Sequence, residues 1–213
     1  MLKPFCALAG ALSLVALPSA VLAQTTVNSS RAAWVTQAGT VMSRDENSNS
    51  FTGVDGGDEY RSYISFAVPA SASAFTSAVI RVNAEGVQSG PNDLTVYDVS
   101  SDIATATGTD LYADFGSGTV FGTITGLTAG ATVDITLNAD GLAAVNAARG
   151  GEISFGFVTS SIEASRDGVF GLSTDITQRQ LILSPTASTA PPSTIPTMSE
   201  WAMILFGLSL AGG

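Results

Sequence analysis

Histidine is absent from this sequence, and lysine and cysteine occur only once each, as Lys3 and Cys6. Several kinds of active site need these residues. Ser-His-Asp and Cys-His catalysis need a histidine, a structural zinc site needs histidine or cysteine ligands, and Schiff-base chemistry needs a lysine. Residues 7–213 contain no histidine, lysine or cysteine, so none of these sites can be formed there.

Basic residues are also scarce. The chain has 8 Lys and Arg against 18 Asp and Glu, a formal net charge of −10 at pH 7. Loss of Lys3 with a signal peptide would make it −11 and leave seven arginines as the only cations. Because phosphate binding depends on Lys and Arg, we expect no nucleic-acid partner. A glycosidase needs two opposed carboxylates, but an acidic chain offers such pairs by chance, so we assign no catalytic residue and interpret the protein as a non-enzyme.

The first 23 residues have the parts of a secretory signal peptide. A lysine precedes an apolar run over residues 5–17, and the small residues Val21 and Ala23 stand just before Gln24. This order predicts cleavage by signal peptidase between Ala23 and Gln24. The apolar run is shorter than the roughly 20 residues that span a bilayer, which disfavours an uncleaved anchor. We expect an exported protein without cysteine.

Residues 24–184 have the pattern of one all-β domain. In residues 62–68, Ile64, Phe66 and Val68 alternate with other residues and so share one face of a strand. Similar runs predict strands at 78–83, 94–99, 120–125, 132–137, 153–157 and 180–183, with weaker strands near Trp34 and Val169. Many short strands between turn residues predict a jelly-roll-like two-sheet β-sandwich.

One short helix interrupts the β pattern. Asn138 is a suitable N-cap, Leu142 and Val145 have helical spacing, and Gly150 can end a helix. These signals predict a helix over residues 139–148. We expect it to cover one open end of the sandwich.

Two strand motifs extend this interpretation. Residues 61–66 read Arg-Ser-Tyr-Ile-Ser-Phe, and residues 77–81 read Ser-Ala-Val-Ile-Arg. Over roughly Ala33 to Ser184 the chain resembles DNRLRE-type sandwich domains, which are related to carbohydrate-binding modules. The resemblance implies a sandwich fold and makes a surface polysaccharide a candidate partner.

The C-terminal residues differ sharply in composition. Residues 185–194 contain only Pro, Ser, Thr and Ala, which is typical of an extended linker. A spacer and a simple disordered tail have the same composition, so both interpretations remain. A last segment follows at residues 195–213, and its residues 202–213 are mainly apolar.

That stretch carries a recognisable motif: Ile195, Pro196, Thr197 and Met198, followed by Trp201. It resembles the IPTL-CTERM sorting signal of exported Gram-negative proteins, with Met198 in the Leu position. The resemblance implies an exosortase-type transpeptidase as partner, transient membrane contact through the C-terminal segment, and final display at the cell surface or outside the cell. The family signal continues into a membrane helix and a basic cluster, whereas residues 201–213 contain no Lys or Arg. We therefore expect either a natural continuation beyond residue 213, which we favour, or a decayed signal. The alternative is an ordinary amphipathic tail.

Two sets of residues could bind a ligand. The carboxylates suited to a structural calcium ion stand in a loop-like stretch: Asp45, Glu46, Asp55, Asp58 and Glu59. The alternative for them is a solvated acidic loop, and no other cofactor is expected. Trp34 is the only tryptophan in the predicted domain, so it is either a stacking platform for a sugar or a core residue.

Two functional hypotheses from different classes follow. The first is a structural or adhesive module displayed at the cell surface or in the matrix. The second is a carbohydrate-binding module for envelope or matrix polysaccharide. A single domain without a catalytic partner favours the first, whereas loss of glycan binding in Trp34→Ala would favour the second.

Overall fold

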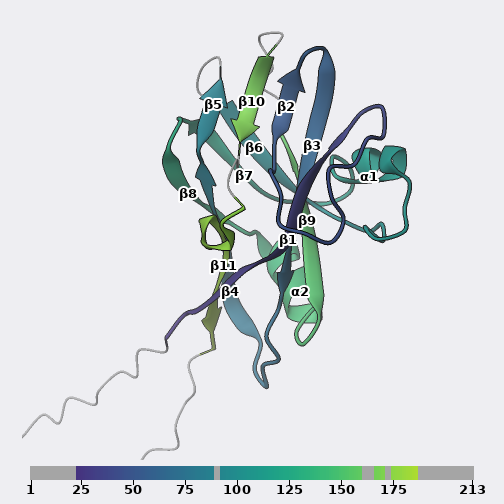
Figure 1. The fold of residues 1–213 in the computed structure, drawn as a ribbon. Helices are drawn as coiled ribbons and strands as arrows, with labels where there is room; N and C mark the ends of the chain where they lie inside the picture. Colours follow the sequence, from purple (N-terminus) through teal and green to yellow (C-terminus); the bar gives the residue numbers. More distant parts are fainter. Residues whose placement is uncertain (1–22, 89–91, 160–165, 171–173, 187–213) are drawn as a thin grey trace, which may run out of the picture.

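The computed structural model describes residues 23–88, 92–159, 166–170 and 174–186 (Figure 1). It is mostly β, with two short α-helices. Ala23 and Gln24 are the first two described residues, and both are exposed. The rest of the predicted signal peptide, nearly all of the predicted linker and the whole IPTL-like motif lie outside the described residues.

The strands in chain order are β1 (Thr25–Thr36), β2 (Thr52–Asp55), β3 (Asp58–Ala67), β4 (Phe75–Ala84), β5 (Gly86–Gln88), β6 (Asn92–Asp98), β7 (Val120–Leu127), β8 (Ala131–Thr136), β9 (Glu152–Val158), β10 (Arg166–Phe170) and β11 (Arg179–Pro185). The helices are α1 (Gly108–Asp114), α2 (Ala139–Ala147) and the 3-10 helix η1 (Ile176–Gln178). All seven stronger predicted strands are present, and the two weaker ones are β1 and β10. The sequence prediction missed β2, β5 and α1.

The first strand joins two groups of antiparallel strands. Residues 25–28 of β1 pair with β11, which continues to β4 and β8. From Ser29 onward, with an irregularity between Ser29 and Arg31, β1 pairs with β3, which continues to β9, β6 and β7. The second group extends further at the start of β3, which pairs with β2. From there β2 pairs with β10, and β10 with β5. A bulge bends a strand and increases its twist, so β1 can pass from one group to the other and curve the sheet into a near-barrel.

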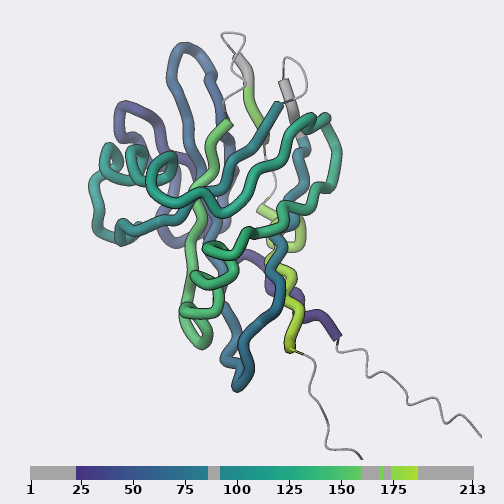
Figure 2. The backbone as a smooth tube through the Cα atoms, turned by 180° about the vertical axis from the view of Figure 1, so that it is seen from behind, coloured from purple at the N-terminus to yellow at the C-terminus, as the bar shows by residue number. Residues whose placement is uncertain are grey.

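Both ends of the described chain lie at one end of the molecule. Thr25 is the register partner of Leu183, so the first residues of β1 run beside the last residues of β11. Figures 1 and 2 show these strands leaving together, away from the β2–β3 turn and α1.

A large apolar core fills the space inside the curved sheet. Ile80, Leu181 and Leu183 are fully buried there, and Phe155 packs against Phe66 and Phe121 with ring centroids 6.1 Å apart in each pair. In β4, buried residues alternate with half-buried ones, as the period of two predicts.

A second, smaller core lies on the opposite face of β1 and β3. Leu111 and Phe115 of the α1 region pack there against Val35 and Tyr63. For this reason residues 62–66 of β3 are all buried rather than alternately exposed. The alternation of Ile64, Phe66 and Val68 predicted one apolar face of this strand. The second face is buried as well, where Tyr63 packs with Leu111 and Phe115.

The predicted helix is confirmed as α2, one residue shorter than expected. The side chain of Asn138 accepts a hydrogen bond from the Gly141 N–H at 3.0 Å, as an N-cap should. Val145 is fully buried in the main core, and the Oδ1 atom of Asn146 accepts a hydrogen bond from the Phe75 N–H at 2.7 Å. These contacts attach α2 to the start of β4.

Candidate binding groove and inner pocket

An open groove lies between the loop after β1 and the loop before α1. Its lining comes from three separate segments: Arg31, Val41, Ser43, Arg44, Asp45 and Ala104. It holds about 460 Å³ of water-accessible space, within the size range of small-ligand sites. We call it the Arg44 groove.

Backbone pairing positions the first wall of the groove. After β1 the chain turns back, and the Met42 N–H donates to the Trp34 carbonyl at 3.0 Å. Further along, the Ala32 N–H donates to the Glu46 carbonyl at 3.1 Å and the Ser48 N–H to the Ala32 carbonyl at 2.7 Å. Residues 42–48 therefore lie along β1 and carry their side chains to fixed positions.

Two arginines brace the groove. Arg44 donates through Nη1 to the carbonyl of Ile103 and through Nη2 to that of Ala106 at 2.8 Å, which joins the two loops. Arg31 donates through Nη1 to the Arg44 carbonyl at 3.1 Å, and its guanidinium forms an ion pair with Glu152. Each guanidinium is thus held in place before any ligand binds.

The groove also carries negative charge at its edge. Asp45 is exposed on the first loop. On the second loop, the pKa of Asp102 is lowered mainly because its carboxylate accepts a hydrogen bond from the Thr105 hydroxyl. A hydrogen bond from the Ala104 N–H lowers it further, and the charges of Arg31 and Arg44 make a smaller contribution. Asp102 is therefore ionised at neutral pH, and acidic and basic groups share this site.

Tyr63 connects the groove to the second core. Its ring is fully buried, and its hydroxyl donates to the Ser43 carbonyl at 3.2 Å. Burial raises the pKa of Tyr63 to about 12. The hydroxyl therefore stays protonated and keeps donating to the groove loop at all ordinary pH values.

The acidic residues proposed for calcium fall in two segments. Asp45 and Glu46 are exposed on the groove loop, whereas Asp55 and Asp58 face each other across the β2–β3 turn. The Oε1 atom of Glu59 lies 3.8 Å from Nη2 of Arg61, and the Glu59 side chain is also a hydrogen-bond partner of Tyr112. Within the described ranges, no three acidic side chains are grouped so that they could hold a metal ion. Calcium binding stays a prediction.

Trp34 is half-buried in β1 and belongs to an aromatic group. Its ring meets Tyr60 edge to face at 5.1 Å between centroids, and Tyr60 meets Phe51 at 4.9 Å. Such contacts stabilise the fold by themselves. A role for Trp34 in stacking on a sugar stays a prediction.

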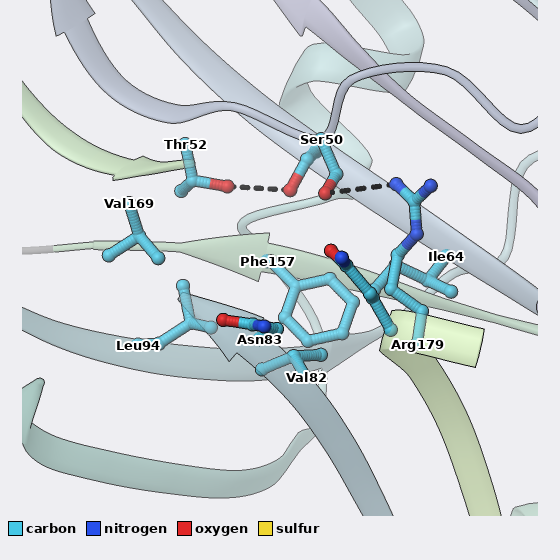
Figure 3. A pocket seen from close by; sticks show the side chains of 11 residues that line it. Ser50, Thr52, Ile64, Val82, Asn83, Leu94, Phe157, Val169 and Arg179 are labelled. Carbon is cyan, nitrogen blue, oxygen red and sulfur yellow. Dashed lines mark hydrogen bonds between the residues drawn. The ribbon is translucent and has the colours of Figure 1, made fainter. Parts of the chain in front are cut away.

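A second, smaller site surrounds Arg179 and is shown in Figure 3. This arginine is 2% exposed, and its Nη1 donates to the Ser48 carbonyl at 2.7 Å and to the Ser50 hydroxyl at 3.2 Å. Burial lowers its pKa. The hydroxyls of Thr52 and Ser62 share a hydrogen bond at 2.5 Å on the same wall.

We call this site the Arg179 pocket. It admits only about 30 Å³ of water, enough for one or two molecules and too little for an organic ligand. Its contacts indicate a structural role in holding residues 48–52 against β11. The sequence carried no signal for it, because an arginine in a strand is usually exposed.

Comparison with protein-family models and with curated proteins finds no match to this chain. Over the part of the chain that the structure describes, no helix has the length and apolar character to cross a bilayer. The candidate function therefore rests on the chain's own residues and geometry.

Proposed function

We propose that the protein is an exported, cell-surface-sorted β-sandwich without catalytic activity, and that it has a structural or adhesive role in the envelope or extracellular matrix. Its finer architecture in this proposal is a jelly-roll-like pair of sheets. The observation that carries the proposal is the pairing of Thr25 with Leu183. This pairing brings the start and the end of the domain to the same place.

The position of the ends suits a displayed module. A tether that follows β11 would begin beside the residue where the signal peptide is cut, so both processing events would occur at one end of the domain. The β2–β3 turn and α1 lie away from that end (Figure 1). They would point outward from the cell, where a structural or adhesive contact is made.

The C-terminal motif supplies the sorting step of the proposal. Pro196 restricts Ile195 to an extended conformation, which suits recognition by a protease-like enzyme. Trp201 suits the headgroup region of a bilayer. The protein would be held briefly at the inner membrane, cut near residues 195–199 by an exosortase-type transpeptidase, and passed to the surface.

Fractionation of cells that produce the full-length protein tests this proposal. Replacing Pro196 and Trp201 together by Ala should leave an uncleaved precursor in the inner membrane. Replacing Pro192 in the linker by Ala is the matched control and should be processed normally. If the double variant is cut and displayed like the wild type, the sorting proposal is wrong.

A second candidate function is carbohydrate binding to envelope or matrix polysaccharide. The Arg44 groove favours it, because its size suits a small ligand and its lining combines polar side chains with small apolar ones. A glycan array with the mature protein and with Trp34→Ala tests this candidate. If neither protein binds any glycan on the array, the carbohydrate-binding candidate is wrong and only the structural or adhesive role remains.

A further inference from the structure

We infer that the Arg44 groove binds a neutral sugar unit of a glycan chain. This inference rests on the carbohydrate-binding candidate above and names the site and the ligand class. Three features support it: the hydrogen-bonding capacity of the lining, the balance of charge, and the rigidity of the walls.

The lining has both hydrogen-bond donors and acceptors, so it suits a ligand that both donates and accepts hydrogen bonds. A guanidinium has five N–H donors, and the hydrogen bonds of Arg44 to the carbonyls of Ile103 and Ala106 use two of its nitrogens. Asp45 can only accept, whereas the Ser43 hydroxyl can do both. Neighbouring hydroxyls on a sugar ring meet this combination, since each can donate to a carboxylate and accept from a guanidinium.

The charge balance favours a neutral ligand. Arg31 is already paired with Glu152, and Asp45 and Asp102 stand near Arg44. The whole chain has a net charge of −10, which would repel an anionic polymer approaching over a distance. A cationic ligand would instead be repelled by the fixed guanidinium of Arg44. The site as a whole therefore gives no net electrostatic attraction to either a cationic or an anionic ligand.

The walls are formed before the ligand arrives. Val41 is bridged to Val35 of β1, and Arg44 fixes the loop that carries Ala104. A rigid site loses little conformational entropy on binding, which leaves more of the contact energy as affinity. Val41 and Ala104 supply small apolar surfaces on which the C–H groups of a sugar can rest.

Titration of the mature protein with neutral oligosaccharides, followed by calorimetry and amide NMR shifts, tests the inference. Glucan, mannan and galactan fragments serve as probes, and a uronate oligomer tests for the charged alternative. We expect shifts in residues 41–46 and 102–106 with a neutral fragment. Stronger binding of the uronate, or no binding of any neutral fragment, would overturn the inference.

Two variants locate the site. Ala104→Trp should fill the groove and abolish binding, and Asp45→Asn should weaken it about tenfold, which corresponds to about 1.4 kcal/mol for one charge-assisted hydrogen bond. Ala139→Trp is the matched control, since this alanine is also exposed but lies on α2. Circular dichroism checks that each variant is folded.

The test separates failure of the site from failure of the function. If Ala104→Trp still binds and Trp34→Ala does not, carbohydrate binding stands but the groove is the wrong site. If neither change matters, the groove inference is overturned as well. The display of the protein at the surface is measured independently by fractionation.

Discussion

Replacing Gly156 by Ala should destabilise the domain by loosening α1. Gly156 lies in β9, directly under the residue that ends this helix. A Cβ at this position would be 2.5 Å from the Phe115 carbonyl oxygen and 2.6 Å from its Cα. These are backbone atoms, so the strain cannot be relieved by turning a flexible side chain.

Two opposing effects set the size of the change. In a strand without strain, Gly→Ala stabilises by about 0.4–1 kcal/mol, because it restricts the unfolded chain. Here an ordinary contact of at least 3.4 Å requires Phe115 to move by about 1 Å. Overpacking typically costs about 1–3 kcal/mol, and partial exposure of the Phe115 ring adds part of the roughly 1.5–3 kcal/mol that its burial contributes. We expect a net loss of about 2 kcal/mol.

Urea and thermal unfolding of the mature protein measure this loss. For a domain of this size, about 2 kcal/mol lowers Tm by about 4–8 °C. Amide hydrogen exchange should also accelerate in α1, at Leu111 and Phe115. Gly151→Ala is the matched control, because its Cβ would meet only the Ala148 carbonyl at an ordinary 3.5 Å. A Gly156→Ala variant as stable as the wild type would refute the argument that α1 packs directly on β9.

Three further predictions concern the pH dependence, the N-terminus and calcium. The contribution of Tyr63 to stability should fall by about 2 kcal/mol as pH rises from 10 to 12, because the unfolded tyrosine ionises near 10 whereas burial raises the folded pKa to about 12. Urea titrations of the wild type and of Tyr63→Phe at each pH measure this contribution as their difference, since burial also raises the pKa of Tyr112 to about 12. Mass spectrometry of the secreted protein should find Gln24 first, and retention of Met1 would contradict signal cleavage. Millimolar calcium should raise Tm relative to chelator if residues 45–59 bind it, and an unchanged Tm would remove that prediction.

The sequence by itself determined most of the regular elements. Strand β4 follows from the alternation of Ala78, Ile80 and Val82, and the structure buries all three. Helix α2 follows from its Asn138 cap and the spacing of its apolar residues. Such signals are local, since a period of two or a cap depends on residues only a few positions apart.

The missed helix shows where local signals fail. Helix α1 has only seven residues, among them Gly108 and Thr109, which are poor helix formers. A helix this short is unstable alone and forms because Leu111 and Phe115 pack on β1 and β3. The same packing buries the second face of β3, so neither feature could be read from the residues of one segment.

Tertiary structure alone decided the candidate groove and the course of β1. Arg31, Arg44 and Ala104 are far apart in the chain and meet because β1 pairs with the loop that follows it while Arg44 holds the loop before α1. Likewise, the bulge near Ser29 lets one strand join both groups of strands. Periodicity tells which face of a strand is apolar, but the partner that covers that face is chosen by contacts between distant segments, whose free energies depend on the whole fold.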